Sequence, residues 1–375
     1  MPGYELLGRE ELEAIKQIFN EKPVLFAHGF DNVRRAYHVR DFEKALEKQF
    51  DSKHAVCVSS GTAAIKIALK ALGVKAGDEV ITQGFNFIAT VEAIHDIGAI
   101  PIITDVDSTL NMCPKSLKEK INKKTRAIIP VHMLGVPARL SDINKIANIN
   151  DIPVIEDACE AIGAKYNGKF VGTITDIGVF SFDFGKNITT GEGGAITTSS
   201  KRLFDFARAY HDHGHMNKKG LPRGLDDALC AGFNYRMTEI SGAIGKVQLE
   251  KLKSITKSHK DRYKILDNLI PQKFQTRQIP DKATPSFDTY VFHVSTTELK
   301  EKVVRLLHEL EIGTKNLPDA MKWHCASYWK HMTVDRDLVA LASVQKRLEK
   351  CVSIPINIRV PEEKYEQIGT EIASL

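Results

Sequence analysis

The chain has 375 residues, of which 43% are hydrophobic and 26% charged, and its formal net charge is +5. A chain of this length can bury a large core in one or two domains, and its composition excludes an intrinsically disordered protein. No apolar run is long enough to span a bilayer. The positive charge is spread through mixed stretches, which does not indicate a nucleic-acid-binding protein.

The six cysteines are scattered, with no CxxC pair, so reduced thiols are expected rather than a disulfide framework. Residues 1–5 lack the basic and then apolar pattern of a signal peptide. We therefore expect a cytoplasmic protein that has no membrane partner.

Residues 9–19 and 39–50 have helical patterns, and the first strand pattern is the apolar run at 55–58. This strand ends in Ser-Ser-Gly-Thr (59–62) and leads into a helix. The free N–H groups and the positive dipole end of a helix N-terminus form a site for an anion. An ordinary helix cap is the alternative, and neither a Walker nor a Rossmann glycine motif is present.

Strand and helix patterns then alternate. The predicted strands are 79–83, 100–104, 127–131 and 154–156, and the predicted helices between them are 89–98, 117–121 and 143–149. Such alternation indicates a mostly parallel sheet with helices on both faces. Ligands of these sheets bind at the carboxyl ends of the strands.

Several notable side chains follow such strand ends. Asp157 comes directly after a buried strand, where an unpaired carboxylate is costly, so it needs a cationic or hydrogen-bonding partner. A cap or a structural ion pair is the alternative. Phe85 and Phe87 follow another strand and could stack on a flat ring, although such residues more often belong to a core.

The stretch at 178–198 contains a short apolar strand, a turn with Lys186, a Thr-Thr-Gly-Glu-Gly-Gly loop and a second strand. Burial lowers the pKa of a lysine and makes its neutral form available to attack a carbonyl and form a Schiff base. The placement of Lys186 between apolar segments favours this role. An ordinary solvated loop lysine is the alternative that this stretch alone leaves open.

The remainder predicts a long helix and a smaller unit. A metal site at 211–215 (HDHGH) is not expected, because the segment lacks a fourth committed ligand; a polar active-site rim or a surface loop fits better. A helix from about residue 237 to 269 is followed by a β-rich segment at 290–294, a helix at 301–310 and a final helix. We predict a large domain at 1–255 and a small α+β domain at 256–375.

In chain order, the sequence thus holds an anion cradle, an aromatic ring, a strand-end aspartate and a lysine between two strands. These groups match the needs of pyridoxal 5'-phosphate: a helix N-terminus for the phosphate, a flat partner for the ring, a carboxylate for the pyridine nitrogen and a lysine for the aldehyde. Each signal alone is weak, and their joint occurrence is much more specific.

The chain also resembles the DegT/DnrJ/EryC1/StrS sugar aminotransferases of the fold-type I pyridoxal-phosphate superfamily. The similarity covers most of residues 40–255, and its matching segments include SSGTAAIKIAL (59–69), PVHMLG (130–135), the segment at 154–182, KNITTGEGG (186–194) and NYRMTEISGAIGKVQLEKL (234–252). The resemblance implies an α/β fold with a large domain, whose mostly parallel seven-stranded sheet is flanked by helices, and a small α+β C-terminal domain.

The family's roles are carried over to the matching positions. The resemblance implies that Lys186 binds the cofactor aldehyde and moves protons, and that Asp157 pairs with the pyridine nitrogen. It further implies that Phe87 stacks on the cofactor ring and that Gly61, Thr62 and Ser181 bind the phosphate. Glu160 would lie near the cofactor 3-hydroxyl, and Asn234 would reach the phosphate of the cofactor in a neighbouring subunit. The last role implies a homodimer with shared active sites.

Some relatives carry histidine in place of the lysine and are sugar dehydratases, so Lys186 favours transamination. The implied reaction moves an amino group from L-glutamate to a keto-sugar carbonyl in surface-polysaccharide or amino-sugar biosynthesis. A nucleotide-linked keto sugar is the usual acceptor in the family. A non-catalytic pyridoxal-phosphate-binding regulator is the alternative from another class, although no DNA-binding module accompanies the full residue set.

The C-terminal third departs from the family pattern. Residues 312–331 stand where many members have a His-Tyr-Pro-Pro-rich segment, and the run at 212–215 (DHGH) resembles transaminases that act on an 8-oxo octulosonate. Such an acid, or a small phosphorylated ketose, is therefore an alternative acceptor. The candidates for the substrate rim are Arg40, His213, His215, Arg236, Lys315 and His324.

Overall fold

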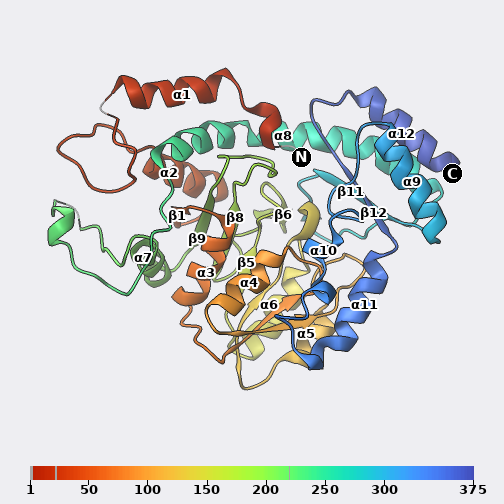
Figure 1. The fold of residues 1–375 in the computed structure, drawn as a ribbon, viewed down its shortest axis with the longest axis horizontal. Helices are drawn as coiled ribbons and strands as arrows, with labels where there is room; N and C mark the ends of the chain where they lie inside the picture. Colours follow the sequence, from red (N-terminus) through yellow and green to blue (C-terminus); the bar gives the residue numbers. More distant parts are fainter. Residues whose placement is uncertain (1–2, 22, 219) are drawn as a thin grey trace.

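The computed structural model describes residues 3–21, 23–218 and 220–375. Residues 1, 2, 22 and 219, which belong to the predicted domain at 1–255, lie outside the described residues. The chain folds as an α/β protein whose helices surround a central sheet (Figure 1).

The central sheet consists of two hydrogen-bonded segments. The first has the strand order β1 (His54–Val58), β9 (Gly194–Thr198), β8 (Ile177–Ser181), β5 (Ile155–Asp157), and the second has the order β3 (Ile100–Thr104), β2 (Glu79–Gln83), β4 (Thr125–Ile129). Parallel bridges from Ile128 to Val154 and from Val131 to Asp157 join β4 to β5. Within the described residues the joined sheet has seven strands, of which β9 runs antiparallel to both neighbours. The predicted seven-stranded, mostly parallel sheet is confirmed.

The strands are buried along nearly their whole length because helices cover the sheet. Every residue of β2, β8 and β9 is buried, which is typical of a sheet covered on both faces. The helices of this part are α2 (His38–Phe50), α3 (Gly61–Ala71), α4 (Ile88–Asp96), α5 (Pro114–Lys120), α6 (Leu140–Ile149) and α7 (Lys201–Tyr210). Helix α7 was not expected from the sequence.

The longest helix, α8 (Glu239–Leu269), runs along one side of the molecule toward the C-terminal part (Figure 1). Helix α1 (Arg9–Asn20) lies against it, and Glu11 accepts hydrogen bonds from Gln248 and Lys251 of α8. The N-terminal helix is therefore anchored to α8.

The C-terminal part has its own hydrophobic cluster, which includes Tyr290, Phe292, Ile354 and Tyr365. Its antiparallel strands and its helices are β11 (Thr289–His293), β12 (Cys351–Pro355), α9 (Thr297–Glu309), α10 (Met321–His324), α11 (Leu338–Leu348) and α12 (Glu362–Ser374). This content agrees with the predicted small α+β unit. The boundary between 255 and 256 stays a prediction, and α8 crosses it as one helix.

Three short strands lie outside these sheets. They pair in the order β10 (Ala283–Thr284), β6 (Lys165–Tyr166), β7 (Lys169–Phe170), so β10, from the predicted small domain, is bonded to a strand of the large one. This pairing therefore connects the two parts at a second place besides α8.

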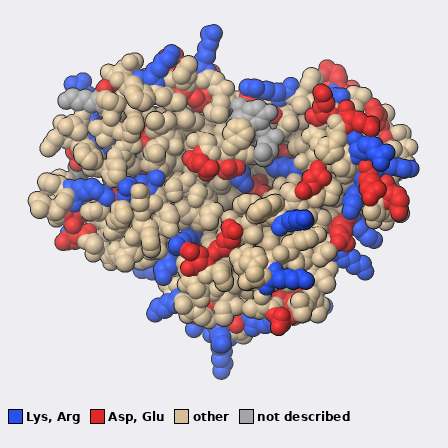
Figure 2. Space-filling model, in the orientation of Figure 1, with Lys and Arg blue, Asp and Glu red and all other residues tan. Residues whose placement is uncertain are grey.

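Lysines and arginines are intermixed with aspartates and glutamates over the face drawn in Figure 2, as the mixed charge pattern of the sequence predicts. Both signs occur over the large part and over the C-terminal part. Within the described residues, no helix combines the length and the apolar character that a membrane crossing requires.

His259, on α8, predicts a loss of stability at acidic pH. Its side chain is fully buried, and burial lowers its pKa from 6.5 to about 4. Asp288 opposes this shift, whereas Lys315 and Arg262 add to it. Below about pH 6.5 the unfolded chain binds a proton at this residue that the folded chain does not bind. The free energy of unfolding therefore decreases as the pH is lowered. Between about pH 7 and about pH 5 this group should cost about 2 kcal/mol.

The variant His259→Leu removes the titrating ring and keeps an apolar side chain of similar size. Urea unfolding of both proteins at the two pH values should show that the variant loses about 2 kcal/mol less stability on acidification. Equal losses in the two proteins would contradict the assignment.

Candidate active site

A cavity of about 320 Å³ lies at the carboxyl ends of the central strands. It collects many of the residues that the sequence analysis selected: Gly61, Thr62, Phe87, Asp157, Glu160, Ser181, Lys186, Lys315 and His324. The location agrees with the rule that ligands of open α/β sheets bind at these strand ends. Their roles stay predictions, but their common location is observed.

Lys186 stands in the turn that follows β8, and its backbone N–H donates to the carbonyl of Asp183 at 3.0 Å. Its side chain is 20% exposed, and Nζ lies 3.9 Å from Oε1 of Glu160. Burial lowers the pKa of Lys186, but the neighbouring acidic groups, with Glu160 first, outweigh it and raise the pKa. The sequence-based expectation of a lowered pKa is therefore wrong for the chain without cofactor, because the cavity that buries the amine also holds carboxylates.

Glu160 lies at the centre of the polar contacts around Lys186. One carboxylate oxygen accepts the backbone N–H of Leu134 at 3.0 Å, and the other accepts the side-chain amide of Asn316 at 3.3 Å. His324 Nε2 lies 3.9 Å from that second oxygen. Burial raises the pKa of Glu160, but Lys186, His324 and Lys315 outweigh it, so the pKa is lowered. Glu160 therefore provides a negative charge beside the lysine.

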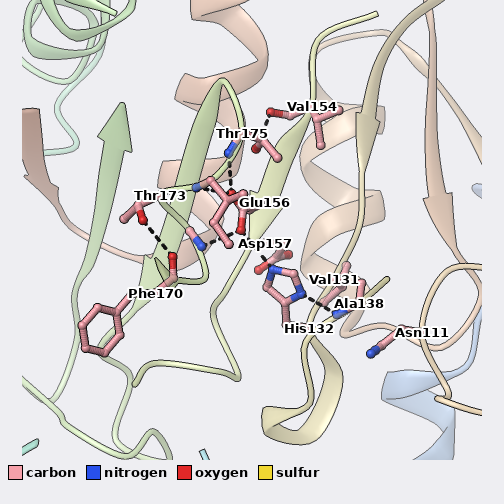
Figure 3. Close-up of polar contacts among 12 residues, drawn as sticks. Asn111, Val131, His132, Ala138, Val154, Glu156, Asp157, Phe170, Thr173 and Thr175 are labelled. Carbon is pink, nitrogen blue, oxygen red and sulfur yellow. Dashed lines mark hydrogen bonds and ion pairs between the residues drawn. The ribbon is translucent and has the colours of Figure 1, made fainter. Parts of the chain in front are cut away.

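Asp157, the last residue of β5, is held by its own backbone hydrogen bonds and by the contacts of its neighbour Glu156. Its N–H donates to the carbonyl of Pro130, and its carbonyl accepts the N–H of His132, each at 3.0 Å. Next to it, buried Glu156 accepts three backbone N–H groups of the 172–175 segment, and Nε2 of His132 lies 3.4 Å from Glu156 (Figure 3). The strand end that presents Asp157 to the cavity is thus fixed from both sides.

The anion cradle forms at the start of α3. The Ser60 hydroxyl oxygen caps this helix by accepting the N–H of Ala63 at 3.1 Å, so Gly61 and Thr62 occupy its first turn. A Cβ atom on Gly61 would lie 2.9 Å from Cβ of Ser181, so only glycine fits this close approach. Free backbone N–H groups, a serine and a threonine beside a glycine therefore meet at one point, which suits a phosphate.

Phe87 lies at the cavity wall directly before α4, and its side chain is 43% exposed. Its ring is near that of His324, with 5.3 Å between the ring centroids. A large exposed aromatic ring at a cavity is available to stack on a flat ligand. Phe85, by contrast, is fully buried in a hydrophobic cluster, so the core interpretation holds for that residue.

Lys315 reaches the cavity from the C-terminal part and forms an ion pair with Asp288. Burial raises the pKa of Asp288, but Lys315 outweighs it and lowers the pKa to about 2. The sequence analysis missed Asp288, as well as Asn86, Thr90 and Asn316, which also line the cavity. Asn86 and Thr90 stand in a segment (85–94, FNFIATVEAI) that resembles the family, but the resemblance assigned a cofactor role there only to Phe87, and no sequence pattern marked Asp288 or Asn316.

The other predicted residues lie outside this lining. Arg40 lines a second cavity of about 570 Å³, together with Arg208 and Arg223. Arg236 donates to Asp212 at 2.7 Å, Nδ1 of His215 lies 3.7 Å from Asp226, and the side chains of His213 and Asn234 are exposed. The proposed substrate rim is therefore divided within one chain: Lys315 and His324 line the cavity with Lys186, and the other four do not.

The HDHGH segment is occupied by contacts within the protein. His211 shares a hydrogen bond of 2.9 Å with His28, and the Asp212 carboxylate accepts hydrogen bonds from Arg223 and Arg236. Burial raises the pKa of Asp212, but these cationic neighbours, with Arg223 first, hold it well below its usual range. Among the residues that the structure describes, no group of three or more potential ligands is placed to hold a metal.

Comparison with known proteins identifies the family of the chain. Residues 25–373 match the DegT/DnrJ/EryC1/StrS aminotransferase family. The chain is similar to GDP-perosamine synthase of Escherichia coli O157:H7, with 43% identity over 218 residues (57% of this chain and 58% of that protein). It is also similar to GDP-perosamine synthase of Vibrio cholerae, with 36% identity over 228 residues (60% and 61%). These two alignments span less than two thirds of either relative.

A solved structure matches nearly the whole chain. The aminotransferase from Psychrobacter cryohalolentis aligns with a TM-score of 0.85 and 26% identity, covering 98% of this chain and 96% of that one. The family match extends over both the large part and the C-terminal part, so it includes every residue that lines the cavity. The chain therefore belongs to the DegT/DnrJ/EryC1/StrS aminotransferase family.

Proposed function

We propose that the protein is a pyridoxal-phosphate-dependent aminotransferase that moves the amino group of L-glutamate to the carbonyl of a keto sugar. Pyridoxal 5'-phosphate is the cofactor of the family. The observation that carries the proposal is the meeting of Lys186, Asp157 and the N-terminus of α3 in one cavity. An amine, a carboxylate and an anion cradle are the groups that this cofactor requires at its aldehyde, ring nitrogen and phosphate.

The cavity residues fit the cofactor in detail. Gly61 leaves room beside Ser181 that any larger residue would fill, so the phosphate can approach the backbone N–H groups of Gly61 and Thr62. Phe87 offers a flat ring for stacking, and Glu160 lies close enough to Lys186 to face the cofactor 3-hydroxyl. When bound, the cofactor withdraws electrons from the substrate carbon that loses a proton.

In the proposed mechanism, Lys186 Nζ removes a proton from the glutamate α-carbon and returns a proton during the reverse transfer to the keto sugar. Glutamate leaves as 2-oxoglutarate, and the sugar carbonyl becomes an amine. Asp157 holds the proton on the pyridine nitrogen throughout, because an ionised carboxylate favours the protonated ring. Glu160 lies near enough to Lys186 to orient its amine, and His324 contacts the same carboxylate oxygen of Glu160.

We propose a nucleotide-linked keto sugar as the acceptor, because two relatives are named GDP-perosamine synthase. An 8-oxo octulosonate or a small phosphorylated ketose is the alternative. The cavity of about 320 Å³ can hold a sugar ring beside the cofactor but is small for a whole nucleotide sugar, so a nucleotide would extend beyond it.

The absorption spectrum of the purified, reconstituted protein tests this function. L-Glutamate should abolish the band of the lysine-bound cofactor and produce the band of its amine form. Keto sugars should then restore the first band, and a GDP-linked 4-keto sugar should do so faster than an 8-oxo octulosonate. A protein that binds no cofactor would contradict the enzyme assignment. A bound cofactor that ignores glutamate would indicate another donor, a dehydratase or a regulator.

We also propose a homodimer in which Asn234 serves the active site of the neighbouring subunit. Asn234 is exposed and outside the lining of its own chain's cavity. Large apolar side chains are exposed near it in sequence, Phe233 at 50%, Leu225 at 69% and Leu229 at 47%, and such surfaces usually mark a protein interface. Sedimentation should therefore give a dimer as the active species, and an active monomer would contradict this proposal.

Mixed dimers can test the role of Asn234 across the interface. Consider a dimer of one Lys186→Ala subunit and one Asn234→Ala subunit. If Asn234 acts on the neighbouring subunit, one of the two sites combines an intact Lys186 from one subunit with an intact Asn234 from the other. If Asn234 acts within its own chain, neither site has both residues. In the first case, refolding the two inactive variants together should restore up to half of the wild-type activity in the mixed dimers. If Asn234 acted within its own chain, mixing would restore nothing beyond the activity of the Asn234→Ala protein alone.

A further inference from the structure

A buried hydroxyl group contacts the carboxylate of Asp157. Thr90, in the first turn of α4, is 1% exposed and lines the cavity, and its Oγ1 lies 2.8 Å from Oδ2 of Asp157. The other oxygen, Oδ1, accepts the backbone N–H of Cys159 at 3.1 Å. Thr90 and the Cys159 backbone thus each donate to a different oxygen of the carboxylate, and the Cys159 thiol is a further hydrogen-bond neighbour of Asp157.

The hydroxyl is the end of a buried chain of hydrogen bonds. Thr82 donates to the carbonyl of Ile129 at 2.9 Å, so its oxygen is free to accept the Asn86 side-chain amide at 3.2 Å. This contact orients the Asn86 amide with its oxygen 3.1 Å from Oγ1 of Thr90. The three side chains are at most 1% exposed, so water does not compete for these positions.

Thr90 has one hydroxyl proton and two acceptors, Asn86 and Asp157. The carboxylate is both nearer and charged, and hydrogen bonds to ionised acceptors are stronger than those between neutral groups. The hydroxyl therefore donates to Asp157. The Asn86 oxygen is the uncharged, competing acceptor for the same proton, and it makes no hydrogen bond to Thr90 while that proton lies toward Asp157.

We propose that Thr90 is a positioning residue whose hydroxyl holds the carboxylate of Asp157 in place for the pyridine nitrogen of pyridoxal phosphate. This inference rests on the proposed function, since it requires the cofactor ring beside Asp157. A buried carboxylate that lacks such a donor binds a proton more readily, because burial penalises its charge. Loss of the Thr90 hydroxyl would thus weaken the ion pair that keeps the proton on the ring nitrogen.

The test compares Thr90→Val, which removes the hydroxyl at nearly constant volume, with Thr90→Ser, which retains it. Cofactor labelled with ¹⁵N at the ring nitrogen reports protonation through its NMR shift, independently of activity. In Thr90→Val the signal should move toward the unprotonated position, and the cofactor Kd should rise roughly tenfold, as expected for one hydrogen bond to a charged group. Thr90→Ser should retain the wild-type signal and affinity.

The matched control is Thr198→Val, at a buried threonine of β9 whose hydroxyl donates to the Asp176 carbonyl at 2.6 Å, outside the cavity lining. It removes a buried hydroxyl in the same way, so it should lower the thermal stability and leave the ¹⁵N signal and the Kd unchanged. If Thr90→Val does not fold, Thr90→Ala provides a second variant without the hydroxyl.

A wild-type ¹⁵N signal and Kd in the folded Thr90→Val or Thr90→Ala protein would overturn the inference and leave the proposed function intact. A Thr90→Ser protein that behaves like Thr90→Val would also overturn it, because the methyl group rather than the hydroxyl would then matter. Failure of the wild-type chain itself to bind the cofactor would instead refute the proposed function, together with this inference.

Discussion

Lys186→Ala should lose roughly 10⁴-fold in the rate of transamination, because the variant lacks the amine that transfers the proton. The cofactor should still bind, since the phosphate cradle at α3 and the carboxylate of Asp157 remain. The absorption band of the lysine-bound cofactor should be absent, and a band of non-covalently bound cofactor should replace it. Single-turnover kinetics with L-glutamate and a keto sugar measure both half-reactions.

The comparison for this variant is Lys169→Ala, at an exposed lysine of β7 outside the cavity lining. It removes one lysine in the same way and should change neither the rate nor the absorption spectrum. Circular dichroism of both variants should match that of the wild type. Activity near the wild-type level in folded Lys186→Ala would remove the proposed role of this residue.

Asp157→Asn should weaken cofactor binding and slow transamination by roughly 10²- to 10³-fold, because a buried cationic ring nitrogen would lose its charged partner. The asparagine has nearly the same shape, so the hydrogen bonds from Thr90 and Cys159 limit any structural change to the amide itself. Equilibrium titration with the cofactor gives the change in Kd. Rates at saturating cofactor separate the loss of binding from the loss of catalysis.

Asp176→Asn provides the same chemical change at an exposed carboxylate that accepts the N–H of Val154 at 2.9 Å. It should leave cofactor affinity and rate close to those of the wild type. Asp157→Glu keeps the charge but displaces it, and it should fall between the wild type and Asp157→Asn. An Asp157→Asn protein with the wild-type Kd and rate would show that the ring nitrogen does not depend on this carboxylate.

Much of the large part could be predicted from local patterns. β2 and β3 coincide with the predicted strands at 79–83 and 100–104, because each contains adjacent β-branched apolar residues, which favour strands. The predicted strand at 127–131 is displaced by two residues from β4 (Thr125–Ile129). Strand ends are hard to place because apolar side chains continue beyond the last backbone pair.

The C-terminal part was less predictable, because its pairing is distant in sequence. β12 (Cys351–Pro355) pairs with β11 (Thr289–His293) across about sixty residues, and the sequence analysis predicted only the second of these strands. A short strand whose partner is distant has no turn signal beside it. The pairing is decided by the hydrophobic cluster that both strands share.

The sequence by itself determined the family, the parallel sheet and the main chemical groups of the cavity, because glycine, lysine and strand-end aspartate occur in a specific local order. Only the tertiary structure decided the electrostatics and the division of the site. It placed Glu160 beside Lys186, which raises the pKa of the amine, and separated Arg40 and Asn234 from the cavity of their own chain. It also brought Thr90 to Asp157 across 67 residues. Distances between segments far apart in the sequence set charge interactions and hydrogen bonds, and no local pattern contains those distances.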